Sequence, residues 1–167
     1  TSGGYAGPAT ATTTLKTSDN DTAGITIAQT GTTDGSGNLL TTEAGSTSTF
    51  TVVLDAKPTA DVTVSITGTD STEHSLSSSS LTFTTSNWNT AQTITVTGVD
   101  DSLDDGDITT TLTATASNSG GYAGTETATT TLKTSDNDSS GITIAQTGTT
   151  DGSGNLLTTE AGSTSTF

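Results

Sequence analysis

The chain has 167 residues, among them 47 Thr, 22 Ser and 19 Gly, and carries 18 acidic against 3 basic side chains, a formal net charge of −15. This charge excludes surfaces that bind nucleic acid or anionic membranes through basic residues. With no Cys and one His, disulfides, thiol nucleophiles and most transition-metal sites are also excluded, and no apolar run reaches the roughly 18 to 20 residues of a membrane span.

Short segments with alternating apolar and polar residues recur along the chain and predict β-strands. In one of them, Phe50, Val52 and Leu54 share a face. No segment has a helical period. In chain order, the predicted strands are 24–28, 49–54, 61–67, 81–83, 93–97, 108–116 and 127–133. The sequence therefore predicts an all-β fold, an Ig-like Greek-key β-sandwich of about seven strands per repeat.

The polar strand positions, one turn and two single residues are predicted to have structural roles. Thr suits the outward strand positions because its branched β-carbon fits a pleated, solvent-facing surface. The stretch 34–38 is predicted as a glycine-rich hairpin turn. Trp88 is predicted to close one end of the core, since a lone aromatic makes a poor sugar-stacking platform. His74 has no second His nearby and is predicted to be a loop residue.

The sequence repeats itself with a period of 117 residues: 118–167 match 1–50 at 45 of 50 positions. A period this long is typical of a domain with its own core, and not of a solenoid coil. We expect 22–138 to be one complete repeat, preceded by the C-terminal tail of another (1–21) and followed by the N-terminal part of the next (139–167). Incomplete repeats leave strand edges unpaired, so we expect neighbouring copies to complete them.

Acidic residues cluster where the predicted strands end. Five carboxylates lie within 100–107, directly after one predicted strand and before the next, and the triplets 19–21 and 136–138 (Asp-Asn-Asp) close successive repeats. Carboxylates so close together repel each other, and the chain has few cations to offset them. Ca²⁺ accepts six to eight oxygen ligands in flexible geometry, so we predict calcium here. The alternative is a solvated acidic loop that keeps the protein soluble.

In order and spacing, these segments resemble the Calx-beta family, the calcium-binding sandwiches of sodium–calcium exchangers that also recur in long bacterial surface proteins. The likeness covers nearly the whole 117-residue unit. Its matching elements are 42–45 (TEAG), 50–54 (FTVVL), 58–64 (PTADVTV), 81–84 (LTFT), 87–89 (NWN), 92–101 (QTITVTGVDD) and 136–138 (DND).

The resemblance implies a set of calcium ligands: an early Glu, an acid before the LTF strand, the paired Asp and following loop, and the closing triplet. Carried over to this chain, they are Glu43, Glu73, Asp100, Asp101, Asp105, Asp136 and Asp138, with Asp19 and Asp21 serving the preceding repeat. Two departures imply fewer ions or weaker binding. Ile108 stands where the family has an acid, and Glu73 stands where it normally has Asp.

Together these features predict a structural module and no enzyme: a calcium-stiffened rod or filament repeat of an extracellular, surface-attached bacterial protein such as an adhesin, sheath or fibre. Its expected partners are neighbouring repeats of the same chain or other copies in a fibre. One alternative is a polysaccharide-binding module that uses Trp88 and polar loops. Another is a calcium-sensing domain, although near-identical repetition multiplies length and does not switch a single partner.

Overall fold

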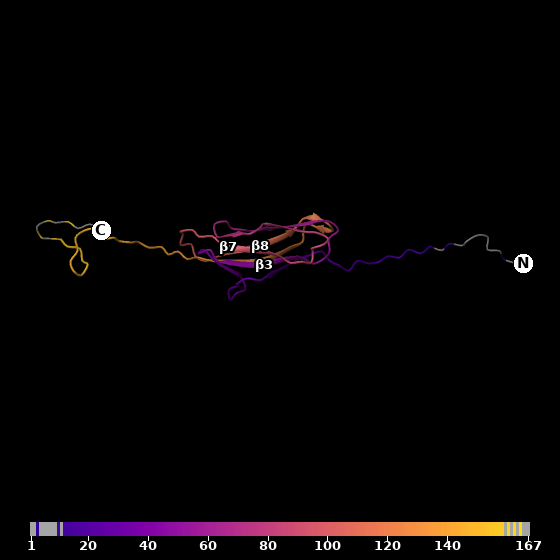
Figure 1. Ribbon diagram of the computed structural model, residues 1–167, viewed down its shortest axis with the longest axis horizontal. Helices are drawn as coiled ribbons and strands as arrows, with labels where there is room; N and C mark the ends of the chain where they lie inside the picture. Colours follow the sequence, from indigo (N-terminus) through magenta and orange to yellow (C-terminus); the bar gives the residue numbers. More distant parts are fainter. Residues whose placement is uncertain are drawn as a thin grey trace.

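The computed structural model describes residues 3, 10, 12–158, 160, 162 and 164 (Figure 1). Within these residues the chain forms eleven strands and no helix. None of these residues belongs to a helix that could cross a membrane. In chain order the strands are β1 (Ile25–Gln29), β2 (Leu39–Thr42), β3 (Thr47–Leu54), β4 (Val62–Thr67), β5 (His74–Leu76), β6 (Ser80–Phe83), β7 (Gln92–Gly98), β8 (Ile108–Ala116), β9 (Asn118–Ser119), β10 (Tyr122–Ala123) and β11 (Thr127–Ser135).

Nine of these strands form two sheets, with orders β1-β3-β7-β5 and β2-β11-β8-β4-β6, while β9 and β10 form a small hairpin. All pairings are antiparallel except that of β2 with β11. This two-sheet arrangement confirms the predicted all-β, Ig-like sandwich. The two sheets hold nine strands and not about seven, because β2 and β5 are only 4 and 3 residues long and too short to show alternation.

The core lies between the inward faces of the two sheets. The predicted inward residues Phe50, Val52 and Leu54 are buried, and Phe50 lies opposite Ile94 in the register of β3 and β7. Threonines pair across the outward faces, as Thr49 does with Thr95, and such cross-strand pairs stabilise a sheet. The period-two pattern therefore predicted correctly which face of β3 is buried.

Two single-residue predictions have opposite outcomes. Trp88 packs against the core as a partly buried side chain, which confirms its structural role. The prediction for His74 was wrong: it begins β5 and is only 1% exposed. Its backbone N–H donates to the Asp70 carbonyl (2.9 Å), and its Nε2 accepts from the Asp70 N–H (3.4 Å). This tight turn buries the ring, and no periodicity in the sequence signals it.

The chain enters and leaves the sandwich at opposite ends of its long axis (Figure 1). At one end, the first residue of β1, Ile25, pairs with Leu54, the last residue of β3. At the other end, Ser135, the last residue of β11, pairs with Thr42, the last residue of β2. All eleven strands lie within the predicted repeat 22–138, whose boundaries remain a prediction.

The tandem copies give a test of what buries a core residue. Leu15 and Leu132 occupy the same sequence, TTTLKTSDND, but Leu15 is 92% exposed whereas Leu132 is fully buried in β11. We expect Leu132→Ala to lower the free energy of unfolding by about 2 to 5 kcal/mol, because it opens a cavity in the core. Leu15→Ala should change it by less than about 0.5 kcal/mol. Urea unfolding of the full chain measures both, and equal effects would contradict the placement of β11.

Candidate metal centre

Loops at the end where β11 leaves the sandwich bring five of the predicted ligands together. They form two groups, Glu43 with Glu73 and Asp105, and Glu43 with Asp136 and Asp138. In each group, one carboxylate oxygen per residue lies within 4.8 Å of the others. Glu43 belongs to both groups, so the two groups make one continuous cluster of carboxylates.

Glu43 is held at the centre of the cluster by its backbone. It directly follows β2, and its N–H donates to the Ser135 carbonyl at the end of β11 (3.1 Å). Gly98 at the end of β7 lies so close to the Thr42 carbonyl that any β-carbon there would overlap it. Glu43 is 2% exposed, and its Oε2 accepts a hydrogen bond from the Asn137 N–H (3.2 Å).

Glu73 reaches the cluster from the turn before β5. Its N–H donates to the Asp70 carbonyl (3.3 Å), and its own carbonyl accepts from the Val99 N–H (2.9 Å), which attaches the turn to the acidic loop. The side chain is 3% exposed, and its Oε2 has no hydrogen-bond partner in the described part of the chain; the same holds for Oδ2 of Asp138. Unpaired buried carboxylate oxygens are costly, and they fit the oxygen shell of a hard cation.

The segment after β11 is bound to the acidic loop at several points. The N–H groups of Gly106 and Asp138 donate to the two oxygens of Asp136 (2.8 and 2.7 Å). Gly106 has a φ of 79°, a conformation that favours glycine and that turns its N–H toward this carboxylate. Further along, the Ser140 N–H donates to Asp104 (2.7 Å). The cluster therefore spans the sandwich and the segment that leaves it.

The other predicted ligands join neither group among the described residues. Asp100 Oδ1 accepts from the Asn137 side-chain amide (3.3 Å), and Asp101 Oδ1 accepts from the Leu103 N–H (2.7 Å). Both border the cluster, because their charges help to raise the pKa of Asp138. Asp19 and Asp21 are exposed in the segment before β1. There the Asp21 N–H donates to Asp19 (3.0 Å), the same local bond that Asp138 makes with Asp136.

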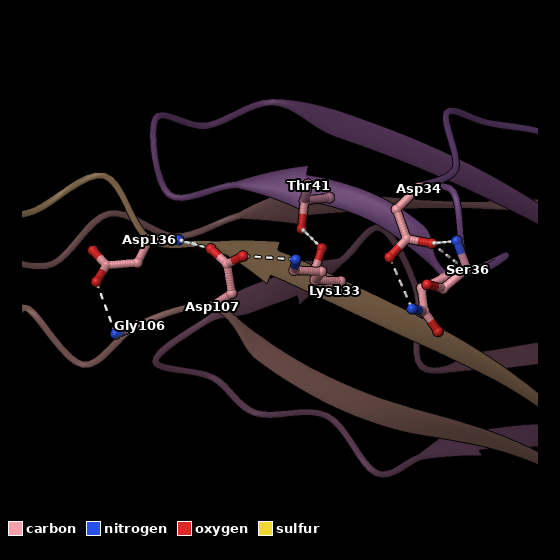
Figure 2. A network of polar contacts seen from close by, with 8 residues as sticks. Asp34, Ser36, Thr41, Gly106, Asp107, Lys133 and Asp136 are labelled. Atoms are coloured by element: carbon pink, nitrogen blue, oxygen red, sulfur yellow. Dashed lines mark hydrogen bonds and ion pairs between the residues drawn. The ribbon is translucent and has the colours of Figure 1, made fainter.

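Sequence reasoning missed Asp107 and Lys133. The Lys133 ammonium lies 2.6 Å from Oδ2 of Asp107, and Oδ1 of Asp107 accepts from the Asp136 N–H (3.1 Å), as Figure 2 shows. Lys133 is 26 positions along the chain from Asp107, and only the pairing of β8 with β11 brings the two together. The only available signal was a lone Lys in a strand that ends in acidic residues.

Burial and like charge act together on the clustered carboxyls. Burial is the main cause that raises the pKa values of Glu43, Glu73 and Asp138, and the neighbouring carboxylates add to it. Asp107 differs, because the hydrogen bond from Lys133 lowers its pKa. The cluster thus holds more negative charge than its surroundings stabilise, which is the electrostatic condition for binding a cation.

Comparisons with known proteins give only distant similarities. No protein-family model matches the chain, and no curated protein matches it. Similar solved structures include SSP-19, an MSP-domain protein-like family member of Caenorhabditis elegans (13% identity, TM-score 0.40, 60% of this chain and 94% of that one). They also include the E. coli chaperone DraB (6%, 0.42, 70% and 55%) and the apo form of the Calx CBD1 domain (12%, 0.38, 68% and 98%). Similarities of this size assign no family.

The raised pKa values predict an unusual pH dependence without metal. A carboxyl whose pKa is raised in the folded state contributes stability below its ordinary pKa, and this contribution is lost as the pH rises through the raised value. In chelator, we therefore expect these three carboxyls to lower the thermal midpoint as the pH rises from their ordinary pKa toward neutral, while His74, whose pKa burial lowers, acts in the opposite direction.

The midpoint of Glu43→Gln should rise relative to that of the unsubstituted chain as the pH increases, because the substitution removes one of the three carboxyls and leaves His74 unchanged. Glu126→Gln is the matched control, since hydrogen bonds, first that from the Ala123 N–H, lower the pKa of Glu126 and place its titration at more acidic pH. Differential scanning fluorimetry across the range measures all three proteins. A midpoint difference between Glu43→Gln and the unsubstituted chain that stays constant as the pH rises would contradict the arrangement.

Proposed function

We propose that the chain is a structural repeat module that binds Ca²⁺ through its acidic end. The observation that carries the proposal is the pair of buried glutamates, Glu43 and Glu73, whose oxygens lie within 4.8 Å of each other and of Asp105. With Oε2 of Glu73 unpaired and no cation other than Lys133 beside the cluster in the described residues, a bound ion would supply the missing positive charge.

The donor set favours calcium over other ions. All five clustered groups are carboxylates from four separate segments, which suits the variable geometry and the six to eight oxygen ligands of Ca²⁺. Mg²⁺ demands a nearly ideal octahedron at shorter distances. Ions that prefer sulfur or nitrogen lack partners here, since the chain has no Cys and its one His, His74, belongs to neither group. The Calx-beta resemblance supports the same ion.

A mechanical role follows from where the ligands lie. Asp136 and Asp138 belong to the six-residue segment 136–141, which joins β11 to the next copy of the β1 sequence. Because the chain enters and leaves at opposite ends, successive repeats would extend along one axis. An ion that binds both the sandwich and this segment would stiffen the junction. We propose a rod or filament module of an extracellular, cell-surface bacterial protein, without enzymatic activity, whose partners are neighbouring repeats or other copies.

Calcium should stabilise the folded state by mass action. At a free concentration of 100 times Kd, one site adds about 2.7 kcal/mol to the free energy of unfolding. We expect calcium to raise the thermal midpoint of the full chain and Glu43→Gln to remove most of this rise, because Glu43 belongs to both groups. Glu126→Gln changes the same charge outside the cluster and should keep the rise. An unshifted midpoint in the unsubstituted chain would contradict calcium binding.

The junction should become rigid when calcium binds. Backbone ¹⁵N relaxation can compare residues 136–138 with the identical triplet 19–21, which joins neither described group. With calcium, we expect the order parameters of the first segment to rise toward about 0.85, the value of rigid backbone. Those of 19–21 should stay low. Calcium binding that leaves both segments equally mobile would retain the ion site and contradict the stiffened junction.

A further inference from the structure

Asp107 is the one acid of the 100–107 loop whose carboxylate forms an ion pair among the described residues. Both its oxygens are already engaged, Oδ2 by the Lys133 ammonium (2.6 Å) and Oδ1 by the backbone N–H of Asp136 (3.1 Å). It is absent from both groups of candidate ligands. Its chemistry therefore differs from that of Asp105, two residues earlier, which is a candidate ligand.

A continuous series of contacts runs from Lys133 to the cluster (Figure 2). Lys133 orients the carboxylate of Asp107, Asp107 holds the backbone of Asp136, and Asp136 in turn accepts from the N–H groups of Gly106 and Asp138. Lys133 lies in β11, a central strand that pairs on both sides, so the series starts from a rigid part of the fold. The series ends at Asp136 and Asp138, which are two of the three residues of the second group.

We propose that Lys133 and Asp107 form a positioning pair for the ion site, which holds Asp136, and through it Asp138, in the geometry that ligates the cation. The inference rests on the proposed calcium binding and adds to it two residues that do not touch the ion. Outer partners of this kind orient metal ligands, and their loss typically lowers metal affinity about 10- to 100-fold.

The sign of the effect separates positioning from simple electrostatics. An ammonium group close to a cation site repels the cation, so removing Lys133 should strengthen calcium binding if charge alone matters. If Lys133 works by orienting Asp107, its removal should weaken binding, because the Asp136 backbone loses its fixed partner. The lysine is 29% and the aspartate 44% exposed, so either can be substituted without opening the core.

The first test compares Asp107→Ala with Asp107→Asn by calcium titration calorimetry on the full chain. The two variants carry the same charge, but Asn keeps an oxygen that can accept from the Asp136 N–H. We expect Asp107→Ala to bind calcium about tenfold more weakly than Asp107→Asn. Equal affinities of the two variants would overturn the positioning role.

The second test compares Lys133→Met with Lys16→Met. Both remove one positive charge, both keep an unbranched apolar side chain, and both lysines lie in the same local sequence, TTTLKTSDND. We expect weaker calcium binding in Lys133→Met. Binding in Lys16→Met should be unchanged, because Lys16 is exposed in the segment before β1. Stronger binding in Lys133→Met would overturn the inference in favour of plain charge repulsion.

Two controls separate the possible failures. Thermal midpoints in chelator show whether each variant is folded, so weaker binding is counted only for variants that unfold cooperatively. If the unsubstituted chain binds no calcium, the proposed function fails and the inference fails with it. If the unsubstituted chain binds calcium and the Ala and Asn variants match each other, the inference alone fails.

Discussion

The structure depends on one electrostatic constraint, the burial of two glutamates beside other carboxylates at one end of the sandwich. Glu43 and Glu73 are 2% and 3% exposed, and burial disfavours their charged forms. The backbone that carries Glu43 is closely packed, because Gly98 contacts Thr42 and the Glu43 N–H donates to the Ser135 carbonyl. Protonation or a bound cation would offset this cost, so a cation that bound there would stabilise the fold.

The parallel pairing of β2 with β11 connects this constraint to the rest of the molecule. It brings the last residue of each strand side by side, so that Glu43 and Asp136 emerge from adjacent strands at the same edge. An antiparallel pairing would have sent one of them to the opposite end of the sandwich. The acidic end and the departing chain thus share candidate ligands, so the ion that we propose there would also influence how one repeat is joined to the next.

The sequence predicted much of this arrangement, but only the parts that local patterns encode. Alternation identified the long strands and the buried face of β3, and acids at strand ends located the cluster, because the ends of neighbouring strands meet in space. Five of the predicted ligands were brought together, whereas Asp100 and Asp101 only border them. The roles of Asp107 and Lys133 depend on strand register, which composition and spacing do not specify. His74 was misjudged because a tight turn, and no periodic pattern, buries it.

The two copies of one sequence separate local from tertiary control. Residues 24–41 and 141–158 are identical, and in both copies the aspartate, Asp34 or Asp151, accepts from backbone and Asn donors to make the same turn. The sequence by itself determined that turn, because all its hydrogen bonds lie within five residues. Ile25 is 8% exposed in β1, whereas its copy Ile142 is 94% exposed and outside any strand. Only the tertiary structure decided this difference, because a strand needs partners for its backbone and an opposing sheet for its apolar face.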